Sequence, residues 1–310
     1  MQLSHRDFTV LDSLAVESAV CLNSTSDRLL ELTRSHPIHI CLSDPIEPER
    51  DLTDRQRVWP AAFLHLSASG CLDPLGPFDA WASVLPIAQF ILKAGLRLVG
   101  IAGPPGSGKS TLAKAIVTVA NAWGDKPSMI SMSLDDFYLS KIDRVAKGLR
   151  YRAQPGSHDI GEAVSVLEAV LERREFLRVP HFDHARDERG APSEYSGTVE
   201  SLILDGWIVG MQEYGYGKIT DLLDAVIFID CPIHLARYRR SDRDYRIQTE
   251  SGGLEGFSHR EMDEFWSTVL QPGILNWVMP IRERADIVIT LDGAGRIVEA
   301  TKKNKIRGRF

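Results

Sequence analysis

A glycine-rich stretch, GIAGPPGSGKST, covers residues 100–111 and follows the apolar run LRLV. Its spacing fits G-x-x-x-x-G-K-[ST], in which the loop amides and the next helix N-terminus hold phosphate groups. The lysine would contact the outer phosphates, and the first hydroxyl residue would coordinate Mg2+. A predicted strand before the loop and a predicted helix after it favour a nucleotide site over a structural turn. The predicted nucleotide-binding residues are Gly103, Pro104, Pro105, Gly106, Ser107, Gly108, Lys109, Ser110 and Thr111.

A carboxylate on a neighbouring strand is the second part that such a phosphate site needs. The segment SLILDGW, residues 201–207, ends an apolar run in Asp205. We therefore predict Ser110 and Asp205 as the protein's metal ligands, with Mg2+ as the ion. An ordinary Asp-Gly turn at the end of a strand is the alternative interpretation of Asp205.

Two adjacent acids, Asp135 and Asp136, follow another predicted strand in SMSLDDFYLS, residues 131–140. Ligands of parallel sheets gather at this end of the strands. Neighbouring side chains commonly point in opposite directions, so we expect only one of the two acids to face the phosphates. That acid would orient an attacking hydroxyl and accept its proton. Capping of the following turn is the competing interpretation of Asp136.

Three further segments carry charged or aromatic residues that could contact an acceptor or the transferred phosphate. YRAQPGSHDIGEA contains His158, and VPHFDHARDERG contains Arg186 and Arg189, whose planar guanidinium groups suit a carboxylate or phosphate. A solvated surface is the alternative for these arginines, and Mg2+ disfavours the histidines as metal ligands. CPIHLARYRRSDRDYR holds five arginines, Arg240 among them, that could close over a phosphoryl group as a lid. The alternative is an ordinary helix whose arginines are neutralised by Asp242 and Asp244 of the same helix.

The segments GIAGPPGSGKST, SLDDFY, PGSHD, PHFDHARDER and LILDGWIVG occur in this order. The ordered set resembles the phosphoribulokinase, uridine kinase and pantothenate kinase group of P-loop kinases over about residues 85–295, and within it the D-glycerate 3-kinases. The resemblance implies Mg2+-assisted transfer of the ATP gamma phosphate to a hydroxyl of a small metabolite. Asp205-Gly206 stands where the group commonly has Glu-Gly.

By position, the resemblance makes Asp135 the base and Asp205 the metal-associated acid. Catalysis would use Asp135, Lys109 and Arg240. The resemblance places substrate contacts at His158, Arg186 and Arg189, and a hydroxy acid such as D-glycerate would suit the arginines. Tyr138 and Trp207 are further predicted substrate contacts, because aromatic side chains could stack on a nucleoside. A nucleoside, pantothenate or a sugar is the nearest alternative acceptor. A regulatory P-loop NTPase without a small acceptor is the alternative from another class.

Apolar runs that alternate with helical patterns predict an α/β fold of the doubly wound P-loop NTPase type. The five predicted strands, mainly parallel and with helices on both faces, cover residues 97–102, 128–134, 200–206, 224–230 and 285–292. Residues 1–95 are expected to form a mostly helical extension, 96–295 the kinase domain and 296–310 a basic, solvated tail. We further expect a possible strand at 36–44, a polar loop at 43–57 and a helix pair broken at Pro272.

Composition limits the classes of partner and compartment. The 310 residues are 44% hydrophobic and 25% charged, which is ordinary for a globular protein. The net charge of -6 gives no reason to expect nucleic-acid binding. Four widely separated cysteines argue against a zinc site or a disulfide framework. No run of about 18 apolar residues is present, so no membrane association is expected and the cytosol is the predicted compartment. Oligomeric state stays open.

Overall fold

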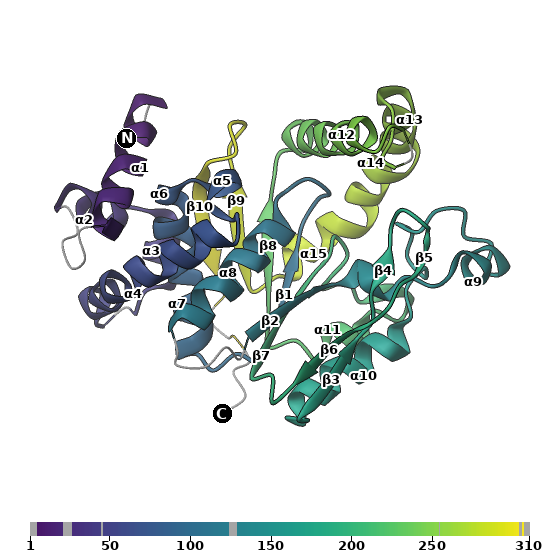
Figure 1. Cartoon of the computed structure of the whole chain (residues 1–310), viewed down its shortest axis with the longest axis horizontal. Coiled ribbons are helices and arrows are strands. Elements are labelled where there is room, and N and C mark those ends of the chain that lie inside the picture. Colours follow the sequence, from purple (N-terminus) through teal and green to yellow (C-terminus); the bar gives the residue numbers. More distant parts are fainter. Residues whose placement is uncertain are drawn as a thin grey trace.

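A computed structural model describes residues 5–20, 27–44, 46–123, 129–253, 255–303 and 306. One six-stranded sheet crosses the molecule in the order β10-β9-β8-β1-β7-β2 (Figure 1). Its strands are β1 (Leu98–Ala102), β2 (Met129–Ser133), β7 (Ser201–Asp205), β8 (Ala225–Asp230), β9 (Ile287–Leu291) and β10 (Ile297–Lys302). All neighbours pair in parallel except β9 and β10. The predicted parallel α/β sheet is confirmed, and four of the five predicted strands match within two residues at each end; the other begins at 128, outside the described residues.

The sixth strand corrects the expectation of a solvated tail after residue 295. A turn closed by the Asp292 amide and the Arg296 carbonyl, 2.9 Å apart, leads β9 into β10, and Gly295 supplies the positive φ of 83° that this turn needs. Only Ile297 and Ala300 of the strand pack against the core. With so few buried positions on an edge strand, and with basic residues at and after its end, the sequence of this segment suggested a solvated tail.

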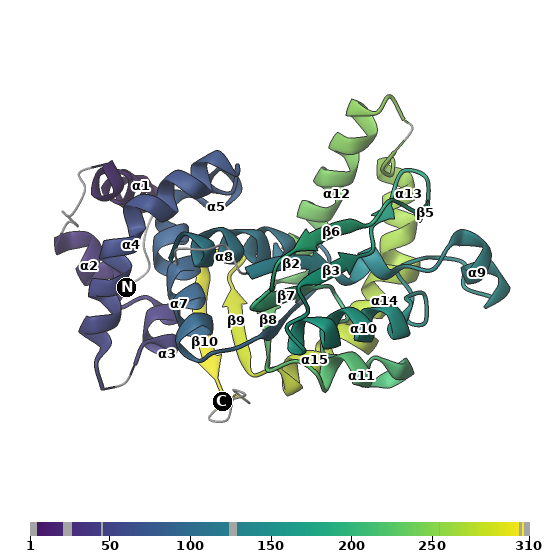
Figure 2. The same cartoon turned by 60° about the horizontal axis from the view of Figure 1, so that its bottom comes forward.

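Helices cover both faces of the sheet. Helix α8 (Lys109–Trp123) lies on one face with the amino-terminal helices, and α10 (Ile160–Leu171), α11 (Gly217–Thr220) and α15 (Met279–Arg284) lie on the other (Figure 2). Parallel strands must be buried on both sides, which explains why every residue of β1 is buried. Two short hairpins project beyond the sheet, namely β3 (Phe176–Val179) with β6 (Ser193–Ser196), and β4 (Phe182–Asp183) with β5 (Glu188–Arg189).

The amino-terminal region is helical, as predicted. Its elements are α1 (His5–Val20), α2 (Asp27–Arg34), α3 (Pro37–Leu42), α4 (Pro48–Ala68), α5 (Leu72–Leu75), α6 (Pro77–Asp79), the π-helical η1 (Ala80–Val84) and α7 (Leu85–Lys93). Helix α4 packs on α8, and α3 packs on β10. The buried side chains of these helices join those of the sheet in one hydrophobic core.

Two expectations for this region were wrong. Residues 37–42 form helix α3 and not a strand, because His36 accepts a hydrogen bond from the Ile38 amide and Pro37 occupies the first helical turn. The predicted polar loop at 43–57 contains the start of α4, where Pro48 again stands at the helix start. Proline at a first turn favours a helix, whereas the same residue inside a polar segment suggested a loop.

The helix pair expected to break at Pro272 is one continuous helical path. It consists of α13 (His259–Phe265), η4 (Trp266–Leu270), α14 (Gln271–Gly273), η5 (Ile274–Val278) and α15, with right-handed helical dihedrals at each junction. The wider π turns η4 and η5 surround Pro272. A wide turn accommodates the proline ring and its missing N–H without breaking the helix.

The remaining elements are η2 (Leu134–Phe137), α9 (Lys141–Ala146), η3 (Glu213–Gly215) and the long helix α12 (Ile233–Glu250). Among the described residues, no helix is both long and apolar enough to cross a membrane.

Candidate active site

The phosphate loop joins β1 to α8, so the first amides of α8 point into it. Gly103, Gly106 and Gly108 have φ values of 145°, 86° and 96°, which side chains other than glycine rarely adopt. Helix α12 also packs closely against this loop. A Cβ at Gly106 would lie 2.3 Å from the Ala236 carbonyl oxygen of α12. This part of the nucleotide site therefore has the backbone shape that its sequence predicts.

Lys109 is buried at the start of α8, where its ammonium group donates to the Pro104 carbonyl at 2.8 Å. Burial lowers its pKa to about 8, although the negative charges of Asp205 and Asp135 raise it. The loop lysine thus shares one electrostatic environment with both predicted acids. A cation held there can contact the phosphates of a bound nucleotide.

Ser110 and Asp205 meet at the end of β7. The hydroxyl of Ser110 donates to the Asp205 carboxylate at 2.7 Å, and β1 pairs with β7 so that Ile101 lies beside Asp205. Burial raises the pKa of Asp205 to about 6, while Ser110 and Lys109 lower it. A hydroxyl and a carboxylate oxygen at this distance fit the hard oxygen ligands that Mg2+ prefers.

The two adjacent acids after β2 have different partners. Asp136 accepts hydrogen bonds from the amides of Ser133 and Phe182, each at 3.3 Å, and completes a capping box of η2. Within the described residues no backbone amide donates to the Asp135 carboxylate. Its side chain is 38% exposed, and its carboxylate lies 3.9 Å from Nε2 of His158. Burial raises the pKa of Asp135, but interactions with His158, His184 and Tyr138 outweigh it, so the pKa lies below its usual value.

Aromatic residues form a wall beside Asp135. Tyr138 and His158 are buried and stack with ring centroids 4.4 Å apart, and Phe182 meets Tyr138 edge to face at 5.3 Å. Nδ1 of His158 lies 2.5 Å from the hydroxyl of Tyr216. The structure therefore brings the predicted residues Tyr138 and His158 together beside Asp135.

Three other predicted substrate residues lie elsewhere. Arg186 is 84% exposed and contacts Asp183 of its own turn at 3.5 Å, and Arg189 pairs with Glu162 of α10. Trp207 is buried against Trp277, with ring centroids 5.7 Å apart. Arg186 lies in the turn after β4 and Arg189 lies in β5, and the tight hairpin directs both side chains outward. Trp207 packs in the core next to the Asp205-Gly206 turn.

A different arginine pair borders the aromatic wall. Arg144 is buried and donates to Asp187 at 2.6 Å, and Arg152 donates to the same carboxylate at 3.1 Å. The charge of Arg152 also acts on Tyr138, on His184 and on Asp244 of α12. Two guanidinium groups share one carboxylate here, so two positive charges lie beside the aromatic wall. Sequence reasoning missed both; the position of Arg152 three residues before PGSHD was the available signal.

Helix α12 covers the phosphate loop with one face. Ala236 and the Arg240 amide approach Gly106, and the Arg240 side chain contacts Asp244 at 2.7 Å. The charge of Arg243 acts on Lys109. The backbone of Arg240 therefore lies beside the loop, while its guanidinium group contacts an aspartate of its own helix; its lid role stays a prediction. The charge of Arg243 lowers the pKa of Lys109, and this arginine was not singled out from the sequence.

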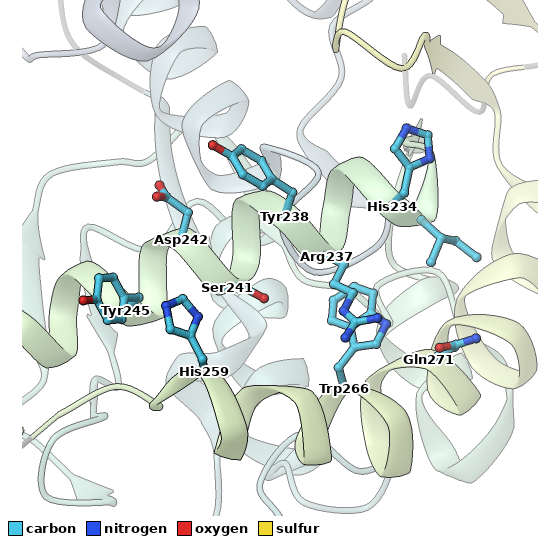
Figure 3. Close-up of a pocket in the computed structure, with 10 residues that line it drawn as sticks. His234, Arg237, Tyr238, Ser241, Asp242, Tyr245, His259, Trp266 and Gln271 are labelled. Carbon is cyan, nitrogen blue, oxygen red and sulfur yellow. The ribbon is translucent and has the colours of Figure 1, made fainter.

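Another face of α12 borders a groove of about 670 Å3 (Figure 3). Tyr245 of α12 and His259 of α13 stack there with ring centroids 4.4 Å apart, and Arg237 contacts Asp263 at 2.8 Å. These contacts attach α12 to α13. None of the groove's lining residues belongs to the phosphate loop or to the metal and base positions.

Residues 98–294, more than half of the chain, match the phosphoribulokinase/uridine kinase family. The chain belongs to this family. Kinase chemistry and nucleotide binding by the P-loop follow from that membership.

Individual relatives are more distant. Uncharacterized kinase mug58 of Schizosaccharomyces pombe is 33% identical over 132 residues, which make up 37% of this chain and about half (47%) of the relative. A pantothenate kinase of Chelativorans sp. is 25% identical over 231 residues, 67% of this chain and 72% of that protein. The solved structure of D-glycerate 3-kinase from Cryptococcus neoformans is 17% identical with a TM-score of 0.58, covering 71% of this chain and 99% of its own. At that identity the likeness is one of fold.

Proposed function

We propose that this kinase transfers the gamma phosphate of ATP to a hydroxyl of a small hydroxy acid, with D-glycerate as the first candidate. The observation that carries the proposal is the grouping of Lys109, the Ser110–Asp205 pair and Asp135 at the ends of β1, β7 and β2. Phosphoryl transfer needs a phosphate cradle, a metal site and a group that orients the attacking hydroxyl. The cytosol stays the predicted compartment.

Each residue has a separate task in this reaction. The loop amides and Lys109 would bind the phosphates, and Ser110 and Asp205 would hold Mg2+, which when bound neutralises charge on the phosphate oxygens. Asp135 would accept the proton of the acceptor hydroxyl while the hydroxyl oxygen attacks the gamma phosphorus. Its lowered pKa keeps it ionised at neutral pH and therefore able to accept that proton.

The preference for an acid as acceptor rests on Arg144 and Arg152. They bring two positive charges close to Phe182, with the Arg144 and Arg152 guanidinium carbons 5.6 and 5.9 Å from its ring centroid. An acceptor carboxylate would be attracted to this charge. They replace Arg186 and Arg189 as the proposed carboxylate contacts. A nucleoside remains the second candidate because the Tyr138, His158 and Phe182 rings offer stacking surfaces.

The test measures ADP release with ATP and Mg2+ across D-glycerate, other hydroxy acids, pantothenate, uridine and simple sugars. Lys109→Ala is the blank, since loss of its phosphate contact should abolish turnover. Stimulation by D-glycerate, together with a rise in its KM of about tenfold or more in Arg152→Met but not in Arg186→Met, is expected. Stimulation by uridine or pantothenate alone would reject the hydroxy acid. ADP release that no acceptor changes would favour a regulatory NTPase.

A further inference from the structure

We propose that Tyr216 fixes the tautomer of His158 so that its Nε2–H points at Asp135 and positions this base. The inference rests on the proposed function for its catalytic meaning, because Asp135 is the proposed proton acceptor. Its structural content, the tautomer, stands on contacts that surround His158 and can be measured without turnover.

Hydrogen bonds to the Tyr216 oxygen decide where its proton goes. The Gly156 amide donates to this oxygen at 3.2 Å. Burial raises the pKa of Tyr216 above its usual value, although hydrogen bonds from the backbone of Gly156 and His158 lower it. An oxygen that already accepts N–H groups directs its own O–H elsewhere. Tyr216 is buried, and in the described part of the chain its remaining hydrogen-bond partner is Nδ1 of His158, 2.5 Å away. Tyr216 therefore donates and Nδ1 accepts.

The imidazole carries its single hydrogen on the other nitrogen. Burial lowers the pKa of His158 although Asp135 raises it, so the ring is neutral at neutral pH. A neutral imidazole whose Nδ1 accepts must carry its hydrogen on Nε2. The stacked Tyr138 ring, tilted by only 26° from the imidazole, restricts rotation of the ring.

Nε2 points into the acceptor site. It is buried and has no hydrogen-bond partner within the described residues, and the nearest carboxylate oxygen is Oδ1 of Asp135 at 3.9 Å. A buried N–H without a partner is destabilising, so a small rotation of the Asp135 side chain that supplies one is favoured. This contact holds one carboxylate oxygen and leaves the other for the acceptor hydroxyl. Catalytic hydrogen bonds commonly shorten in this way when substrate binds.

The assignment also determines the proton's path. Asp135 takes the proton from the acceptor hydroxyl as the oxygen–phosphorus bond forms and the bond to ADP breaks. Nε2 already carries a hydrogen and cannot accept another from Asp135 while His158 stays neutral. The proton therefore leaves from the partly exposed Asp135 to water, and His158 acts as a positioning residue.

The first measurement is imidazole 15N NMR on the full chain at neutral pH, with the His158 signal identified by its loss in His158→Gln. We expect a protonated Nε2 and an unprotonated Nδ1, and a mixture of tautomers in Tyr216→Phe. A hydrogen on Nδ1 in the wild-type protein would overturn the inference. Failure of the proposed function would leave this result unaffected, so the two outcomes are distinguishable.

The second measurement compares His158→Gln with His158→Asn on whichever acceptor is turned over. The glutamine amide reaches the position of Nε2, and the asparagine amide reaches that of Nδ1. We expect kcat within about fivefold of wild type for the glutamine variant and a loss of about 30-fold or more for asparagine, with similar KM for ATP. Equal losses in the two variants would contradict a role for Nε2–H.

His181 provides a matched control because it contacts the other acid, Asp136, at 3.2 Å from the exposed surface. His181→Asn should leave kcat within about threefold of wild type. A loss in His181→Asn as large as in His158→Asn would show that kcat responds to any histidine beside these acids and would reject the assigned role.

Discussion

Asp205 is the proposed metal-binding acid, and its burial opposes the stability of the fold. Burial raises its pKa from 3.8 to about 6. Because the folded state holds this proton more tightly than the unfolded state, stability falls as pH rises from about 4 to about 6 and stays lower above that range. The carboxylate that suits Mg2+ thus carries a desolvation cost when no cation is bound.

We predict that Asp205→Asn raises the free energy of unfolding by about 1 to 2 kcal/mol near pH 8 in the presence of a chelator, because the buried charge is removed. The loss of its attraction to Lys109 keeps the gain this small. Thermal unfolding at several pH values measures the difference, which should disappear near about pH 4. A difference that is independent of pH would contradict the assigned pKa. Phosphoryl transfer should be lost at every pH.

Asp135 and Asp136 form a matched pair with separate expected roles. Asp135→Asn should leave ATP affinity nearly intact and lower transfer by at least about a hundredfold, because the proton acceptor is removed. Asp136→Asn should lower stability by about 1 kcal/mol through its cap and the Phe182 amide, with a much smaller loss of kcat. Steady-state kinetics and ATP titration check both variants. Normal transfer by Asp135→Asn would exclude it as the base.

At the scale of the elements, helix α12 packs against the phosphate loop at Gly106, where no room is left for a Cβ atom. Gly106→Ala would place a Cβ 2.3 Å from the Ala236 carbonyl, and its φ of 86° is also unfavourable for alanine. We predict a loss of about 2 to 4 kcal/mol in the free energy of unfolding and weaker ATP binding. Gly148→Ala is the control, since its φ is 71° but no atom lies within 4 Å of the new Cβ. Similar losses in chemical denaturation would show that strain alone, without the α12 contact, explains the effect.

The sequence predicted the sheet because its parallel strands are short apolar runs buried on both faces. It also predicted that Lys109, Ser110 and Asp205 lie close together, because local motifs place these residues after neighbouring strands; their roles stay predictions. Arg186 and Arg189 were a different case, because a tight hairpin decides which way their side chains point. Which arginines of α12 lie near the phosphate loop depends on their rotation about the helix axis, so their number in the sequence did not reveal that the charge of Arg243 acts on Lys109. Tyr216 reaches His158 from 58 positions away, a contact without a local signal.

At the scale of the whole molecule, the amino-terminal helices and the sheet share one hydrophobic core. Trp59 of α4 is fully buried, donates to the Ala15 carbonyl at 2.9 Å and meets Trp81 edge to face. Buried Arg55 reaches Gln89 of α7 at 2.6 Å. Since α4 packs directly on α8, we infer that the helices and the kinase sheet unfold together.

We predict one calorimetric transition, which Trp59→Ala shifts as a whole with a loss of about 3 to 5 kcal/mol. Leu64→Ala on the same helix is the control, because Leu64 is exposed and its loss should change stability by less than about 0.5 kcal/mol. Two resolved transitions, with only one of them moved by Trp59→Ala, would show that the helices and the sheet are independent units.

The most direct test of the central claim follows the phosphate itself. The protein is incubated with ATP labelled with 18O on its gamma phosphate, Mg2+ and D-glycerate, and mass spectrometry locates the label. The account predicts labelled phosphoglycerate formed in step with ADP, none of it in Lys109→Ala, and little of it in Asp135→Asn. Label found only in inorganic phosphate, whether or not D-glycerate is present, would contradict transfer to a hydroxy acid.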